Sequence, residues 1–599
     1  MHPSSLRRSA LLVLTLLSAC AAADPGQAPG PSAGQASAQF PELASGAAMR
    51  GSTGVAAAYL IGRYAARQND LEFAADQFIR ALKGDPDNPE LQQQAFLAAL
   101  MAGRPEANQL AGNLQDNQAA ALLLANTEAR AGHWASAQAK FTALPHVGLL
   151  AVLQPLAIAW CQAGAGQFDA ASETLKPYLA APQMRAVYTL HAALIADLGR
   201  RPGGDAGRLY QQALVDYGGS NLELGRMIAS WQARNGQMDA AHATIATMVE
   251  GSADLAMSAP ALQAAVTQPV IRNAADGLAE SYLALAAALH AQNANDFAAV
   301  LLRLALDLRP DLTPARLLDS ELLAAARHPD AALRMLQPVA VNEPLSALVR
   351  QRQAVLMAQL GDNAGALKLL EQLAVEFPNR PEPPAIEGDL LRADHKYTEA
   401  VKAYDRAVAL LGPPARINWP LFYDRGVAFD RAHEWAKAEA DLLTALALSP
   451  EQPVVLNYLG YSWTEQGINL PRARQMLERA VEQRPNDGAI IDSLGWVVLR
   501  QGDVPGAVKY LERAVELEPE DASINAHLGD AYLAAGRRLE AQFQWRRSLN
   551  LNPDPDDLVK LQEKLRDDHA GADRAIRAQI VVPQTPVAVA APGADKTLR

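Results

Sequence analysis

The stretches LNYLGYSWTEQGINLPRARQMLERAVEQRP (residues 456–485) and IDSLGWVVLRQGDVPGAVKYLERAVELEP (residues 491–519) repeat one order of glycine, alanine, alanine and proline. The glycines of this series, which are separated by 34 to 38 residues, are Gly388, Gly426, Gly460, Gly495 and Gly529. The alanines follow in step at Ala400, Ala438, Ala473, Ala507 and Ala541, and prolines close the units at Pro450, Pro485, Pro519 and Pro553. A fixed period of this length indicates a structural unit that is repeated along the chain.

The markers have a physical reason if each unit is a pair of packed helices. Small residues allow two helices to approach closely, and proline ends the second helix because it cannot continue the hydrogen-bond ladder. Larger residues would fill the space beside them: Leu442, Leu477, Leu511 and Trp545. A 34-residue period with these markers resembles the tetratricopeptide repeat, a pair of antiparallel helices per unit. The resemblance implies an all-α fold, a superhelical solenoid of about 10–14 helical hairpins.

The pattern weakens toward the N-terminus. Good matches recur around residues 62–86, 298–310 and 366–378, and the segments between them keep amphipathic helices but lose the markers. We therefore expect a degenerate array over residues 55–380, a regular block over 381–554, a capping helix over 555–567 and a disordered tail over 568–599. A chain of 599 residues exceeds what one hydrophobic core organises, which also favours a solenoid.

The N-terminus has the layout of a secretory signal, with Arg7 and Arg8 followed by the apolar run ALLVLTLL. The sequence LSAC that ends at Cys20 resembles the lipobox of bacterial lipoproteins, which implies cleavage after residue 19 and lipidation of Cys20. Ala21 resembles the class that is sent to the outer membrane and faces the periplasm. Residues 20–54 are rich in Ala, Gly, Pro and Ser, so they predict a flexible tether. The alternative is an ordinary cleaved signal with a chance cysteine.

Several function classes find no support in the sequence. The formal net charge of −12 argues against nucleic-acid binding, which needs a dense basic face. The histidines are scattered, no catalytic or nucleotide-binding motif is present, and the repeats leave no room for a separate catalytic domain. The apolar run LAIAWCQAG predicts that Cys161 is a buried apolar residue rather than a reactive thiol. We expect a chain that is not an enzyme and has no cofactor or metal.

The resemblance also implies a binding surface, because in this family the first helices of successive units line a concave groove. The residues of this sequence that fall on that face are Asp389, Arg392, Tyr423, Asp430, Arg431, Asn457, Tyr461, Glu465, Asp492, Trp496, Arg500 and Asp530. The two large aromatics that follow packing glycines, Tyr461 and Trp496, either contact a partner or fill the core between repeats. The arginines of the last repeat (537, 538, 546 and 547) indicate either an anionic partner or a solvated face.

The combination of lipobox, tether and long repeat array resembles two groups of bacterial lipoproteins. One group comprises adaptors that bind a periplasmic carboxyl-terminal processing protease and deliver peptidoglycan hydrolases to it. The other comprises pilotins and assembly lipoproteins of secretion, pilus or envelope systems. The length of the array favours an adaptor, which would raise the effective concentration of its protein partners near the outer membrane.

Overall fold

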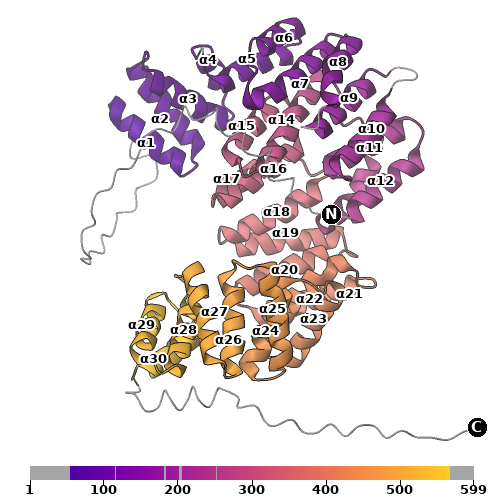
Figure 1. The fold of residues 1–599 in the computed structure, drawn as a ribbon. Helices are drawn as coiled ribbons and strands as arrows, with labels where there is room; N and C mark the ends of the chain where they lie inside the picture. Colours follow the sequence, from indigo (N-terminus) through magenta and orange to yellow (C-terminus); the bar gives the residue numbers. More distant parts are fainter. Residues whose placement is uncertain (1–53, 115, 181–183, 201–204, 251, 567–599) are drawn as a thin grey trace, which may run out of the picture. The chain divides into compact units, whose positions relative to one another are not determined.

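The computed structural model describes residues 54–566 apart from 115, 181–183, 201–204 and 251. These residues form 30 α-helices and three short 3-10 helices, with no strand in the described part of the chain (Figure 1). The predicted all-α array of helical hairpins is thereby confirmed. The predicted signal peptide, Cys20, nearly all of the tether and the tail lie outside the described residues. Among the helices described, none combines the length and the apolar character needed to span a bilayer.

The chain divides into two compact units, one up to Pro378 and one from Asn379. Nine helical hairpins make up the described part of the first unit, with α13 and two 3-10 helices as additions. Its helices are α1 (Val55–Arg67), α2 (Leu71–Gly84), α3 (Pro89–Met101), α4 (Glu106–Ala111), α5 (Gln118–Arg130), α6 (Trp134–Thr142), α7 (Gly148–Gly164), α8 (Phe168–Leu175), η1 (Lys176–Leu179), α9 (Arg185–Leu198), α10 (Ala206–Tyr217), α11 (Leu222–Arg234), α12 (Met238–Glu250), η2 (Ala253–Ser258), α13 (Ala259–Ala264), α14 (Ala274–His290), α15 (Asn295–Leu308), α16 (Thr313–Ala325), α17 (Pro329–Leu336), α18 (Ser346–Gln359) and α19 (Asn363–Glu376).

The second unit has five hairpins and a closing helix within the described residues. Its helices are α20 (Glu382–Ala393), α21 (Tyr397–Leu410), η3 (Arg416–Asn418), α22 (Trp419–Arg431), α23 (Trp435–Leu448), α24 (Pro453–Gln466), α25 (Leu470–Gln483), α26 (Gly488–Arg500), α27 (Val504–Leu517), α28 (Ala522–Ala534), α29 (Arg538–Asn550) and α30 (Pro555–Arg566). The fourteen hairpins of the two units lie at the upper end of the predicted 10–14.

The turn between α26 and α27 shows how the sequence builds a hairpin. Gly502 takes a left-handed conformation with φ of 89°, which glycine adopts without a steric penalty. Asp503 then caps α27, because its carboxylate accepts a hydrogen bond of 3.0 Å from the backbone N–H of Gly506.

The repeated glycines of the second unit lie where the two helices of a hairpin meet. A Cβ atom at Gly460 would lie 2.9 Å from Leu477, one at Gly495 2.7 Å from Leu511, and one at Gly529 2.5 Å from Trp545. Each partner of these glycines is a buried side chain of the following helix. The small-against-large packing predicted from the repeat is therefore present.

The first unit departs from a simple solenoid, in which each repeat contacts only its neighbours. The hairpin of α14 and α15 packs on α3, α5, α7 and α9, although one to four hairpins lie between them in the chain (Figure 1). Tyr282 donates a hydrogen bond of 2.9 Å to Asn126, and Asn126 in turn donates one of 3.3 Å to the carbonyl of Leu304. The inner side of these earlier first helices is thus occupied by the chain itself.

Candidate functional site

The predicted binding residues of the second unit lie on the first helices of its five hairpins. They are distributed as Asp389 and Arg392 on α20, Tyr423, Asp430 and Arg431 on α22, Asn457, Tyr461 and Glu465 on α24, Asp492, Trp496 and Arg500 on α26, and Asp530 on α28. Backbone contacts place α20 beside α22, α24 beside α26 and α26 beside α28. The contact of Tyr423 on α22 with Tyr458 on α24 joins the two groups. We call this row the first-helix face. Its role in binding stays a prediction.

At its N-terminal end the face is a network of polar side chains between two repeats. The hydroxyl of Tyr404 donates a hydrogen bond of 2.7 Å to Asp389. Arg392 donates to that hydroxyl at 3.2 Å and to Asp424 of the next repeat at 3.1 Å. Burial, and then the charge of Asp389, raises the pKa of Asp424 to about 7, despite the opposing charge of Arg392. Asp389 and Arg392 are therefore engaged with their neighbours.

The middle of the face is aromatic. The rings of Tyr423 and Tyr458 meet edge to face with centroids 5.9 Å apart. Tyr458 also donates a hydrogen bond of 2.8 Å to Asp430. Arg431 at the end of α22 is exposed, and Asn457 has a buried side-chain oxygen without a hydrogen-bond partner among the described residues.

At the C-terminal end, Trp496 lies between repeats. Its side chain stacks on His527 with centroids 4.3 Å apart, and its indole N–H donates to Glu465 at 2.5 Å. Only 5% of Trp496 is exposed, so its ring fills the space between α24, α26 and α28. Of the two alternatives for Trp496, the structure shows the packing role. Tyr461, by contrast, is half-buried.

Two aspartates on this part of the face are also buried. Asp492 is within 2.8 Å of the Nδ1 atom of His527. Asp530 accepts hydrogen bonds from Trp545 at 2.9 Å and from Lys564 at 2.7 Å. These carboxylates hold neighbouring helices, including the closing helix α30, and in this arrangement they present little surface to a partner.

Sequence reasoning missed three residues that complete the face: Asp424, Tyr458 and His527. Each stands two positions before a packing glycine, at Gly426, Gly460 and Gly529 respectively. Each pairs with a predicted residue of the preceding repeat, namely Arg392, Asp430 and Asp492. The glycine register of the repeat therefore carried the signal that locates them.

The charge state of His527 depends on its carboxylate neighbours. Burial lowers its pKa, but Asp492 first, and then Glu465 and Asp530, outweigh the burial, so the pKa is raised overall. A protonated imidazole here is compatible with the three carboxylates around it.

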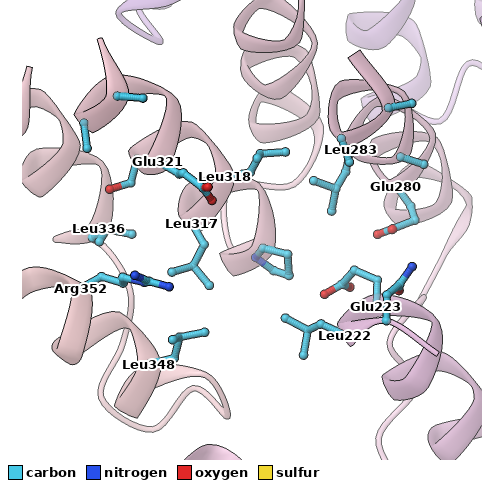
Figure 2. A pocket seen from close by; sticks show the side chains of 18 of the residues that line it. Leu222, Glu223, Glu280, Leu283, Leu317, Leu318, Glu321, Leu336, Leu348 and Arg352 are labelled. Atoms are coloured by element: carbon cyan, nitrogen blue, oxygen red, sulfur yellow. The ribbon is translucent and has the colours of Figure 1, made fainter. Parts of the chain in front are cut away.

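The first unit contains a cavity of about 960 Å³, which no sequence pattern indicated. Figure 2 shows leucines from α11, α14, α16, α17 and α18 around it, with Glu223 and Glu280 on one wall and Arg352 on another. Glu280 is 2% exposed, and burial, followed by the charge of Glu223, raises its pKa to about 8. A volume of this order is typical of a small-molecule site.

The described part of the chain contains neither a cluster of metal-binding side chains nor an accessible thiol. No group of three or more His, Cys, Asp or Glu side chains there is placed to hold a metal ion. Cys161 is fully buried, as the sequence predicted, and burial raises the pKa of its thiol to about 12.

The class of protein follows from these features: an array of helical hairpins with a row of polar and aromatic first helices is a protein-interaction scaffold. Residues 423–488 and 498–565 match family models described as tetratricopeptide repeat, so this part of the chain consists of tetratricopeptide repeats.

One curated relative is the TPR repeat-containing protein PA4667 of Pseudomonas aeruginosa, 31% identical over 167 residues. The match covers 28% of this chain and 27% of the relative, so it spans about a quarter of the relative's length.

Two solved structures match this chain at low TM-scores. The APC/C hetero-tetramer Cut9-Hcn1 is 14% identical, with 86% of this chain and 97% of that chain covered and a TM-score of 0.37. YrrB, described as a TPR protein with an unusual peptide-binding site, is 19% identical, with 32% of this chain and 97% of that chain covered and a TM-score of 0.26.

Proposed function

We propose that this chain is a lipid-anchored scaffold of the bacterial outer membrane, an adaptor that brings a periplasmic processing protease together with its cell-wall hydrolase substrates. The observation that carries the scaffold role is the row of first helices in the matched tetratricopeptide repeats. The lipobox at residues 17–20 supports the anchor. A scaffold of this kind acts by raising effective concentration and needs no catalytic group.

The exposed members of the first-helix face are the best positions for detecting a partner. We would replace Arg431, an exposed residue on α22, with the photo-crosslinking amino acid p-benzoylphenylalanine. Arg513 on the second helix α27 is the matched control, because its side chain is also exposed, at 49%. The proposal predicts crosslinks to a protease or a peptidoglycan hydrolase from position 431 and none from position 513.

Other outcomes of this experiment have a definite meaning. Crosslinks to a secretin or a pilin would replace the adaptor role with that of an assembly or pilotin-like lipoprotein. Equal crosslinking from both positions would contradict a binding role of the first-helix face. Recovery of cytoplasmic proteins alone would contradict the periplasmic location.

The anchor is tested separately with Cys20→Ala. Without the thiol that carries the lipid, we expect the chain to leave the outer-membrane fraction and appear in the soluble periplasm. Sedimentation of this variant with the outer membrane would refute the lipid anchor and leave the scaffold role untouched.

A further inference from the structure

The cavity of the first unit lies between α9, α11 and α14 on one side and α16, α17 and α18 on the other. Apolar residues form most of its lining, among them Leu222, Leu283, Leu317, Leu318 and Leu348 (Figure 2). A space of about 960 Å³ with such walls matches an apolar ligand of moderate size.

Two carboxyl groups interrupt this apolar wall. One carboxyl oxygen of Glu280 is buried and has no hydrogen-bond partner among the described residues, although only 2% of the residue is exposed. Glu223 also has one buried oxygen without a partner, and its other oxygen lies 3.4 Å from Arg226. Buried polar groups are normally paired, because an unpaired one loses its hydration without compensation. The two glutamates therefore form an unsatisfied acidic end of the cavity.

The nearby cations do not complete this end. Arg226 on α11 is the partner of Glu223, and Arg309, which follows α15, lies 3.8 Å from Asp276 and 3.4 Å from Asp311. Across the cavity, Arg352 on α18 pairs with Asp254 at 2.7 Å. The other ionisable side chains that face Glu280 or line the cavity are Tyr217, Glu321 and, beside Glu223, Glu343. Acidic groups thus outnumber basic ones around Glu280.

The folding of the chain limits what can occupy this space. The inner side of α3, α5, α7 and α9 is covered by the hairpin of α14 and α15, so an extended segment cannot continue along it. What remains is a cavity bounded by helices, with an apolar body and one acidic end. We propose that it binds a cationic amphiphile, an apolar chain or ring system with one protonated amine, whose nitrogen sits at Glu280 and Glu223.

This arrangement gives binding a definite pH dependence. Glu280 has a pKa raised to about 8 through burial and the charge of Glu223, while Arg309 and Arg226 act in the opposite direction. Near neutral pH its carboxyl is protonated, and an ammonium group that arrives beside it favours loss of that proton. We expect the affinity for the amine to rise with pH up to about 8. At pH 7, binding of the amine should release a proton from Glu280.

The test compares decylamine with decanol by titration calorimetry on the full chain, kept free of detergent and below micellar concentrations. The amine, protonated below about pH 10, is expected to bind roughly tenfold more tightly than the alcohol, which is about 1.4 kcal/mol. Glu280→Gln should abolish this preference while leaving decanol binding unchanged. Glu321→Gln is the matched control, because Glu321 lines the same cavity with a side chain that is 69% exposed.

A second variant guards against loss of fold. Leu317→Trp places a large ring in the cavity and should weaken both ligands, with the helical circular dichroism of the chain retained. Equal affinity for amine and alcohol, or an amine preference that survives Glu280→Gln, would overturn the proposal. A leucine-lysine-leucine peptide that binds more tightly than decylamine and depends on Glu280 would overturn the small-molecule assignment in favour of a protein segment.

Discussion

The contact between Gly277 on α14 and Trp160 on α7 tests whether the internal hairpin holds the first unit together. A Cβ atom on Gly277 would lie 2.2 Å from the Cη2 atom of Trp160 and 2.3 Å from two further ring atoms. Ordinary van der Waals contacts of a Cβ start at 3.4 Å, so Gly277→Ala requires a relative displacement of about 1.2 Å. Trp160 is fully buried, and its indole N–H donates a hydrogen bond of 3.1 Å to His191. The ring therefore has no free direction in which to move.

The expected cost can be assembled from these facts. Overpacking a core costs about 1–3 kcal/mol, and a weakened buried hydrogen bond adds roughly 1 kcal/mol. Replacing a glycine inside a helix with alanine stabilises the helix by about 1 kcal/mol. Gly277→Ala should therefore destabilise the first unit by about 2 kcal/mol. Gly112→Ala is the matched control, because the nearest atom to a Cβ there lies 3.4 Å away.

Hydrogen exchange followed by mass spectrometry is the suitable assay, because it reports each unit separately. Faster exchange is expected in α7, α9 and α14 of Gly277→Ala, and unchanged exchange in the second unit. Adding Trp160→Phe should recover part of the loss, since a smaller ring makes room for the new methyl group. Exchange in α7 and α14 that matches the wild type would refute the reasoning that these helices are held by close contact.

Three further predictions concern buried titratable groups. The pKa of Glu280 is raised to about 8, whereas an unfolded glutamate titrates near 4.3, so the folded state binds more protons between these pH values. The free energy of unfolding should therefore fall as pH rises from about 5 to 8. Glu280→Gln should flatten this slope in urea unfolding curves by up to about 1.4 kcal/mol per pH unit, and an unchanged slope would contradict the prediction. The raised pKa of His527 contributes stability at low pH, and this contribution is lost as pH rises through that pKa. Because Asp492 is the main group that raises it, Asp492→Asn should lower the pKa of His527 in an NMR titration. A constant pKa would show that Asp492 does not set it. Cys161, whose thiol pKa burial raises to about 12, should resist iodoacetamide at pH 8 until the chain is unfolded, as peptide mapping can show; rapid native labelling would contradict its burial.

The regular repeats were predictable because each marker has a local cause. Gly460, Gly495 and Gly529 lie against Leu477, Leu511 and Trp545, and this contact occurs within one hairpin. Periodicity reports such local contacts directly. The same holds for the placement of the first-helix face, since a register fixes which side of a helix a residue occupies.

The rest depends on contacts between residues far apart in the sequence. Asn126 meets Tyr282 across 156 positions, and a repeat pattern carries no information about which distant hairpin folds back on which. The cavity beside Glu280 depends on the same fold-back, so no local sequence motif predicts it. His527 was missed for another reason: its pairing with Asp492 follows the glycine register, but a single histidine on a helix matches no catalytic motif.

The fold-back of α14 and α15 also bears on how the chain acquires its structure. In an array of neighbouring contacts, folding can begin at any repeat and spread, as the second unit allows. In the first unit, Trp160 and Asn126 have to wait for residues beyond 270 before their burial is complete. Such long-range contacts slow folding, because the chain loses conformational entropy in bringing distant segments together before the stabilising contacts form. A growing polypeptide would thus expose the apolar side of α5 and α7 until α15 is made, and the first unit is acquired as one cooperative piece rather than repeat by repeat.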